Sequence, residues 1–154
     1  MAMHNWFLCK IRYEKTMENG MNKKVTEPYL VDALSFTEAE ARIIEEMTPF
    51  ISGEFTVEDI KRARYSELFP CEEEAADRWF KCKLAYITLD DRSGAEKKTT
   101  TNVLVQAATT EDANKKLHEG MKGTMAEYKI ESIAETKLVD VFPYTSSVTA
   151  DEAR

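Results

Sequence analysis

Near the start of the chain stands the stretch WFLCKIRY, residues 6–13, which returns as WFKCKLAY at residues 79–86. The two stretches lie 73 positions apart, and five of their eight positions are identical. Ile11 is replaced by Leu84, a swap that nearly conserves side-chain volume. A match of this kind suggests that one structural unit occurs twice in the chain.

Further pairs of segments follow in the same order and at nearly the same spacing. The spacing is 74 positions for the first pair and 73 for the other two: LVDALSFTEA at 30–39 with LVQAATTEDA at 104–113, FTVEDI at 55–60 with YKIESI at 128–133, and FP at 69–70 with FP at 142–143. A one-residue change of spacing confined to loops is what two copies of one fold produce. We therefore interpret the chain as a tandem duplication.

Hydrophobic alternation predicts a strand at the start of each copy. Phe7, Cys9 and Ile11 share one face, while Lys10 and Arg12 lie on the other, and residues 79–86 repeat these two faces. Turn-forming residues follow at 18–20 and 90–94. The next strands, around 25–33 and 99–107, are expected to pair back as hairpins.

A helix is predicted next in both copies. SFTE at 35–38 has the pattern of a capping box, and TTED at 109–112 is a weaker version with Asp in place of Glu. Apolar residues then recur at every fourth position, which predicts one buried stripe on each helix: Ala39, Ile43 and Met47, then Ala113, Leu117 and Met121. Pro49 and Gly123 end the helices. Extended segments follow at 54–60 and 127–133, and shorter ones at 65–69 and 138–142.

These elements predict an α+β fold made of two β-β-α-β copies related by a pseudo-twofold axis. Each copy forms an antiparallel sheet with one helix on one face. The predicted division places the first repeat at residues 1–70, an acidic linker at 71–78, the second repeat at 79–143 and a flexible tail at 144–154. The inward core comprises Phe7, Cys9, Ile11, Phe80, Cys82 and Leu84, packed against Ile43, Met47, Leu117 and Met121.

Composition excludes several classes of protein. Among 154 residues, 43% are hydrophobic and 32% are charged, and no apolar run approaches the roughly 20 residues that cross a bilayer. The net charge of −7 disfavours strong, non-specific binding to nucleic acid or to anionic membranes. Three cysteines without a CxxC pair disfavour a disulfide framework and a structural zinc site. With no signal-peptide pattern at the N-terminus, the expected location is the cytoplasm.

No constellation of residues indicates catalysis. His4 and His118 lie at non-equivalent positions of the two copies, and no nucleophile elbow, zinc-protease motif or phosphate-binding loop is present. Glu72, Glu73 and Glu74 are interpreted as a solvated linker rather than a cation site, and Cys9 and Cys82 as small apolar core residues. We therefore expect a protein that is not an enzyme, without catalytic residues, a metal site or a cofactor.

One candidate binding surface remains, the outward face of the first strand of each copy. It carries aromatic and basic side chains: Trp6, Lys10 and Arg12, then Trp79, Lys81 and Lys83. Such rows on an open sheet bind nucleic acid or phosphate-bearing ligands in several small domains. The alternative is structural, because a Trp at the start of a strand often packs between half-domains and outward cations are usually just solvated.

The motif WFLCK at 6–10, together with YLVDALSFTEAE at 29–40, resembles an uncharacterised family found in gut anaerobes and in their phages and mobile elements. The resemblance covers almost the whole chain up to Pro143 and implies no activity and no site residues. It implies a phage-associated or mobile-element accessory protein. The predicted function is a non-enzymatic protein-interaction or accessory module, with a protein partner or self-association. The alternative is a binder of single-stranded nucleic acid or of a nucleotide through the outward Trp and Lys rows.

Overall fold

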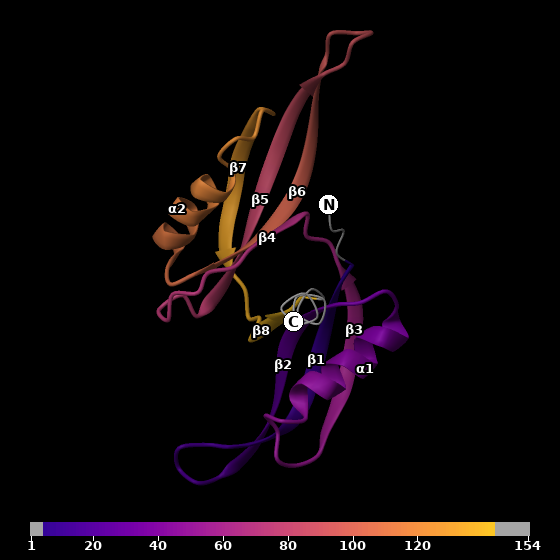
Figure 1. Ribbon diagram of the computed structural model, residues 1–154, viewed down its shortest axis with the longest axis vertical. Helices are drawn as coiled ribbons and strands as arrows, with labels where there is room; N and C mark the ends of the chain where they lie inside the picture. The colour runs from indigo at the N-terminus through magenta and orange to yellow at the C-terminus, as the bar shows by residue number, and fades with distance from the viewer. Residues whose placement is uncertain (1–4, 144–154) are drawn as a thin grey trace, which may run out of the picture. The chain divides into compact units, whose positions relative to one another are not determined.

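The structure is a computed structural model that describes residues 5–143, and it has the α+β class that the sequence predicts (Figure 1). The elements in chain order are β1 (Trp6–Thr16), β2 (Asn22–Asp32), α1 (Phe36–Met47), β3 (Phe55–Ala63), β4 (Glu67–Phe69), β5 (Arg78–Leu89), β6 (Glu96–Ala107), α2 (Thr110–Gly120), β7 (Tyr128–Glu135) and β8 (Asp140–Phe142). Within the described part of the chain they form two compact units, residues 5–64 with 137–143, and residues 65–136.

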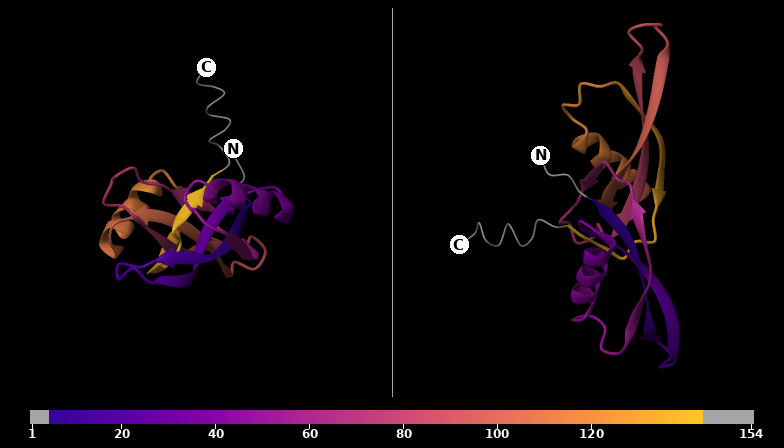
Figure 2. Two further views of the ribbon diagram at one scale, coloured as in Figure 1. Left: turned by 90° about the horizontal axis from the view of Figure 1, so that it is seen from below. Right: turned by 90° about the vertical axis from the view of Figure 1, so that its right-hand side faces the viewer.

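The first unit is a four-stranded sheet in the order β3-β1-β2-β8, covered on one face by α1 (Figure 2). Its core forms between the inward side chains of the strands and the buried stripe of the helix. Phe7, Cys9 and Ile11 are fully buried, as predicted, and they share the core with Ile43 and Met47. The alternation of β1 therefore decides which face of this sheet meets α1.

The second unit is a four-stranded sheet in the order β7-β5-β6-β4, with α2 against one face (Figure 1). Phe80, Cys82 and Leu84 are buried with Leu117 and Met121, which confirms the predicted inward residues of this copy. Only Phe80–Tyr86 of β5 pair with β7, so the β5–β6 hairpin extends past the end of that strand.

Local sequence explains the hairpins and the helix starts. Gly20 and Gly94 have positive φ values of 83° and 71°, which side chains with a Cβ rarely adopt, and they close the two β-hairpins. Ser35 Oγ accepts from the Glu38 amide at 3.1 Å, and Thr109 Oγ1 accepts from the Asp112 amide at 3.1 Å. Both predicted caps are therefore present.

The last short strand of each half of the sequence belongs to the other half's sheet. The chain leaves the first unit after Arg64, and β4 pairs with β6; it returns at Lys137, and β8 pairs with β2. This exchange differs from the predicted division, in which residues 1–70 and 79–143 each keep their own last strand. The segment 71–78 likewise lies wholly inside the second unit.

The exchanged strands also make the sheets mixed rather than antiparallel. Each sheet has two antiparallel pairs and one parallel pair, the parallel one involving β4 or β8. A three-residue strand is too short for its hydrophobic pattern to specify a neighbour or a direction. The predicted tail at 144–154 and His4 lie outside the described residues.

The two sheets have the same register throughout. Three operations convert the pairings of the first sheet into those of the second: 73 is added to the residue numbers of β1 and β3, 74 is added to those of β2, and 73 is subtracted from those of β8. The pair Trp6–Ala63 at the end of β1 is the exception, because the corresponding pair is not formed in the second sheet. Both sheets also carry a β-bulge at the same point, between Lys10 and Ile11 and between Lys83 and Leu84. Equal registers are what a tandem duplication predicts; the duplication and its pseudo-twofold axis stay inferences.

Candidate functional site

The outward face of β1 and β5 divides into a buried end and an exposed end. Trp6 and Trp79 are only 3% and 5% exposed, at the end where β1 and β5 begin. Leu30 and Leu104, the outward residues of the neighbouring strands close by, are fully buried. Neither Trp side chain is therefore open for a base to stack on, which removes the aromatic part of the predicted ligand face.

The predicted cations lie beyond this buried end. Lys10 is half-buried, and Arg12, Lys81 and Lys83 are exposed. Lys10 and Arg12 stand two residues apart on one face of β1, and Lys81 and Lys83 do so on β5. The structure thus places each pair of cations together within its own unit.

A glutamate occupies the bulge in each edge strand next to these cations. Glu58 of β3 and Glu131 of β7 are the extra residues, because the register skips them. Glu131 forms ion pairs with Lys98 and with Lys83, the latter at 3.9 Å. The Lys98 ammonium, and more weakly that of Lys83, lowers the pKa of Glu131. In the first unit, Glu58 instead accepts a hydrogen bond from Thr26 at 3.1 Å.

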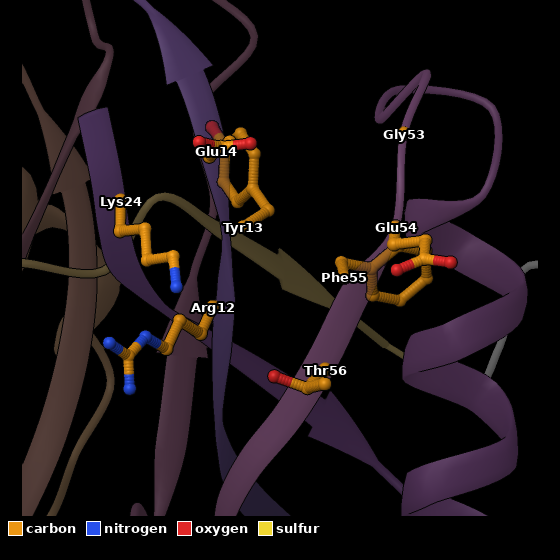
Figure 3. Close-up of a pocket in the computed structure, with 8 residues that line it drawn as sticks. All are labelled: Arg12, Tyr13, Glu14, Lys24, Gly53, Glu54, Phe55 and Thr56. Atoms are coloured by element: carbon orange, nitrogen blue, oxygen red, sulfur yellow. The ribbon is translucent and has the colours of Figure 1, made fainter. Parts of the chain in front are cut away.

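A pocket of about 630 Å³ opens beside Arg12 in the first unit (Figure 3). In this view the Lys24 amino group and the Thr56 hydroxyl point toward the side where Arg12 lies. The residues that line the pocket come from β1, β2, the start of β3 and the loop before it: Arg12, Tyr13, Glu14, Lys24, Gly53, Glu54, Phe55 and Thr56. Because the lining has two cations and two carboxylates, it favours neither sign of ligand charge.

A smaller pocket of about 400 Å³ adjoins the bulge of the second unit, lined by Lys83 and residues 129–132 of β7. Sequence reasoning found Lys83 and the strands beside it, but it did not single out Lys24, Lys98 or the two bulge glutamates. The hairpin register could have found Lys24 and Lys98, because they face Glu14 and Ile87 across the strands. Nothing in a single sequence marks the bulge positions.

The other reactive side chains have structural surroundings. Burial raises the pKa of Cys9 to about 12 and that of Cys82 to about 11, so both thiols stay protonated in the core. Glu73 of the linker pairs with Lys116 at 3.4 Å, while Glu72 and Glu74 are exposed. Among residues 5–143, no three His, Cys, Asp or Glu side chains are grouped so as to hold a metal ion.

In the part of the chain that the structure describes, no helix has both the length and the apolar character needed to cross a membrane. No curated protein and no solved structure matches this chain. A family model does match it over residues 5–144, which include both units and both exchanged strands. The chain therefore belongs to the family described as a domain of unknown function, DUF4494.

Proposed function

We propose that this protein is a non-enzymatic protein-interaction module that associates with a second copy of itself through apolar side chains on and beside α1. The observation that carries the proposal is their exposure. Leu34, Phe36, Ile44 and Phe50 are between 42% and 77% exposed. Four exposed apolar side chains of this size, on and directly beside one helix, favour an interaction surface over an ordinary solvated one.

The second unit shows that the fold does not require these residues. The residues of the second unit that correspond to Leu34, Phe36 and Ile44, 74 positions later, are Ala108, Thr110 and His118. Both helices have the same cap and the same buried stripe. A helix with small or polar residues at these places thus fits a sheet of the same order and register, so the fold does not require apolar side chains there.

One of these side chains is held in place. The Phe36 ring stands edge-on to Phe7 with centroids 5.0 Å apart, and the Arg62 guanidinium lies 5.3 Å from the Phe7 ring centre and 5.7 Å from that of Phe36. Because Phe7 and Arg62 already hold the half-exposed Phe36 ring in one orientation, the ring loses little conformational entropy when a partner covers it. This arrangement suits a binding surface better than a freely moving surface ring would.

The test exchanges residues of α1 for those of α2 and measures molar mass by light scattering over a range of concentrations. The wild-type chain is expected to form a concentration-dependent dimer. The double variant Leu34→Ala, Ile44→His is expected to stay monomeric with an unchanged circular dichroism spectrum. Met125→Ala removes a side chain that is 98% exposed in the other unit, and it should leave the dimer intact. A wild-type monomer at all concentrations, or equal loss of dimer in the control, refutes the proposal.

The alternative function, binding of single-stranded nucleic acid or a nucleotide, is supported by the exposed cations Arg12, Lys81 and Lys83. It now depends on charge rather than on stacking, because both Trp side chains are buried. Labelled oligonucleotides should then bind with an affinity that falls steeply as salt rises, and Lys10→Glu with Lys83→Glu should abolish binding. Anisotropy that does not change at low salt excludes this function.

Two finer points of the proposal have narrower support. Association with phages or mobile elements rests on the resemblance of WFLCK and YLVDALSFTEAE alone. A cytoplasmic location is supported by Cys9, Cys71 and Cys82, all of which are free thiols.

A further inference from the structure

The two exchanged strands share one sequence pattern. β4 and the residue after it read Glu67-Leu68-Phe69-Pro70, and β8 with its next residue reads Asp140-Val141-Phe142-Pro143. In each case an acidic residue is followed by an aliphatic residue, Phe and Pro. The Pro cannot donate a backbone hydrogen bond, so it suits the place where a strand leaves the sheet.

The two strands also dock in the same way. Leu68 lies opposite Leu104 of β6, and Val141 lies opposite Leu30 of β2, both pairs in parallel strands. One backbone hydrogen bond opens each pairing: the Ser66 amide donates to Asn102 at 2.8 Å, and the Val139 amide donates to Pro28 at 2.9 Å. The edges of β2 and β6 thus present the same pattern of backbone groups to an incoming strand.

The Phe residue anchors each strand, although its surroundings differ. Phe142 stacks on Tyr29 with ring centroids 6.1 Å apart and contacts the core of the first unit. Phe69 contacts the core of the second unit and lies against Gly120, where a Cβ would be only 2.8 Å from its ring. Both edges therefore offer an apolar place for Phe one residue after the aliphatic side chain.

Each docked strand reaches its edge through a short connector. Three residues, Arg64 to Ser66, join β3 to β4, and four residues, Thr136 to Val139, join β7 to β8. We propose that the edges of β2 and β6 are docking sites for an extended acidic–aliphatic–Phe–Pro segment, and that β4 or β8 of a second copy of the chain can fill them. This strand addition would yield a strand-exchanged dimer independent of the α1 surface.

The chain's own strand competes with the strand of a second copy. A short tether gives the attached strand an effective concentration on the order of millimolar, so the edge is normally filled from within the chain. Docking from outside therefore requires an edge that has lost its own strand. This condition determines the design of the experiment.

The experiment uses the full chain with Val141→Asp and Phe142→Asp, which place charges at the two apolar positions of β8. Two fluorescent peptides serve as the strand of a second copy: residues 137–143, KLVDVFP, and residues 64–70, RYSELFP. Fluorescence anisotropy should show both peptides binding the variant with affinities within tenfold of each other. Wild-type protein, whose edge is filled by its own strand, should bind each peptide at least tenfold more weakly than the variant does. Peptides with Ala in place of Phe should bind the variant with an affinity at least tenfold lower.

Each other outcome counts against the proposal. Binding of KLVDVFP alone shows that the edges are not interchangeable, and equal binding to the wild-type chain shows that the peptides bind elsewhere. Should the variant unfold, a chain with a protease site at Lys137 can be cut after folding. The cut removes the tether of β8 without any substitution in that strand. If an excess of either peptide then fails to displace the cut segment, the docking site is refuted. Loss of the α1 dimer would leave these results unchanged, so the two proposals fail separately.

Discussion

Gly120, the last residue of α2, lies directly beneath the ring of Phe69 from β4. Its φ is not positive, so replacement by Ala would ordinarily stabilise the helix by up to about 1 kcal/mol. Here the added Cβ would stand 2.8 Å from Phe69 Cζ. We expect Gly120→Ala to destabilise the protein by about 1–3 kcal/mol in urea unfolding, because the ring must move.

The matched control is Gly53→Ala, where nothing lies within 4 Å of the added Cβ and φ is not positive. This variant should change stability by less than about 0.5 kcal/mol. Combining Gly120→Ala with Phe69→Leu should cost less than the sum of the two single changes, because the smaller side chain relieves the contact. A more stable Gly120→Ala protein would contradict the placement of β4.

The three thiols differ in accessibility. Cys9 and Cys82 are buried, whereas Cys71 is half-exposed, and its amide donates to the Gln106 side chain at 2.9 Å. Thiolate is the reactive species, and burial raises the pKa of both core thiols well above neutral pH. A colorimetric thiol reagent at pH 8 should therefore modify one thiol quickly in the folded protein and three after unfolding. The Cys71→Ser variant should show no fast phase; a fast phase that persists would contradict this assignment.

At the scale of the element, the start of α2 links folding to pH. The pKa of Asp112 is lowered, first by the hydrogen bond from the Ala108 amide and then by Lys116, whose ammonium lies 2.9 Å from Asp112 Oδ2. A carboxyl whose folded pKa is depressed contributes stability above its unfolded pKa of about 4, and this contribution is lost as pH falls through the folded value.

We therefore expect Asp112→Asn to lower the melting temperature at pH 7 and to have little effect near pH 2. The difference between the two proteins should shrink as pH falls below about 4. Melting curves at several pH values measure this difference in melting temperature. An NMR titration of the Asp112 carboxyl checks the direction of its pKa shift directly. A difference that stays constant down to pH 2 would show that the charge of Asp112 plays no part.

At the scale of the whole molecule, the strand exchange determines where a substitution is felt. Val141 lies in the second half of the sequence, yet it pairs with Leu30 of β2 in the first unit and is buried. A charge there disrupts the sheet that receives β8. In the Val141→Asp variant, the amides of Leu30 and Val31 should exchange hydrogen at least tenfold faster, which corresponds to a free energy of opening lower by about 1.4 kcal/mol. The amides of β5 and β6 should keep their protection.

The counterpart Leu68→Asp in β4 should have the opposite distribution, with faster exchange in β6 and protection retained in β1 and β2. Two substitutions at equivalent positions thus report on different sheets. If each one instead affected the sheet of its own half of the sequence, the observed topology would be wrong.

The alternation at residues 6–13 and 79–86 was sufficient to predict which side chains enter the two cores. The reason is that a strand's two faces differ strictly every second residue. The helix caps at Ser35 and Thr109 were equally predictable, because capping uses groups only three residues apart. The exposure of Trp6 and Trp79 could not be read in this way, since alternation assigns a face without saying what covers it.

Local pattern and the repeat spacing therefore determine the strands, hairpins, helices and cores of this protein, because each depends on residues that are neighbours in sequence or on the match between two copies. The partners of β4 and β8 are decided only in the tertiary structure. Their acidic–aliphatic–Phe–Pro patterns are alike, so either edge satisfies either strand by local criteria. The ion pair between Glu131 and Lys98 is likewise decided in the tertiary structure, because it forms only when β6 and β7 lie on either side of β5. Such contacts depend on which distant segments the folded chain brings side by side, and no short-range pattern contains that information.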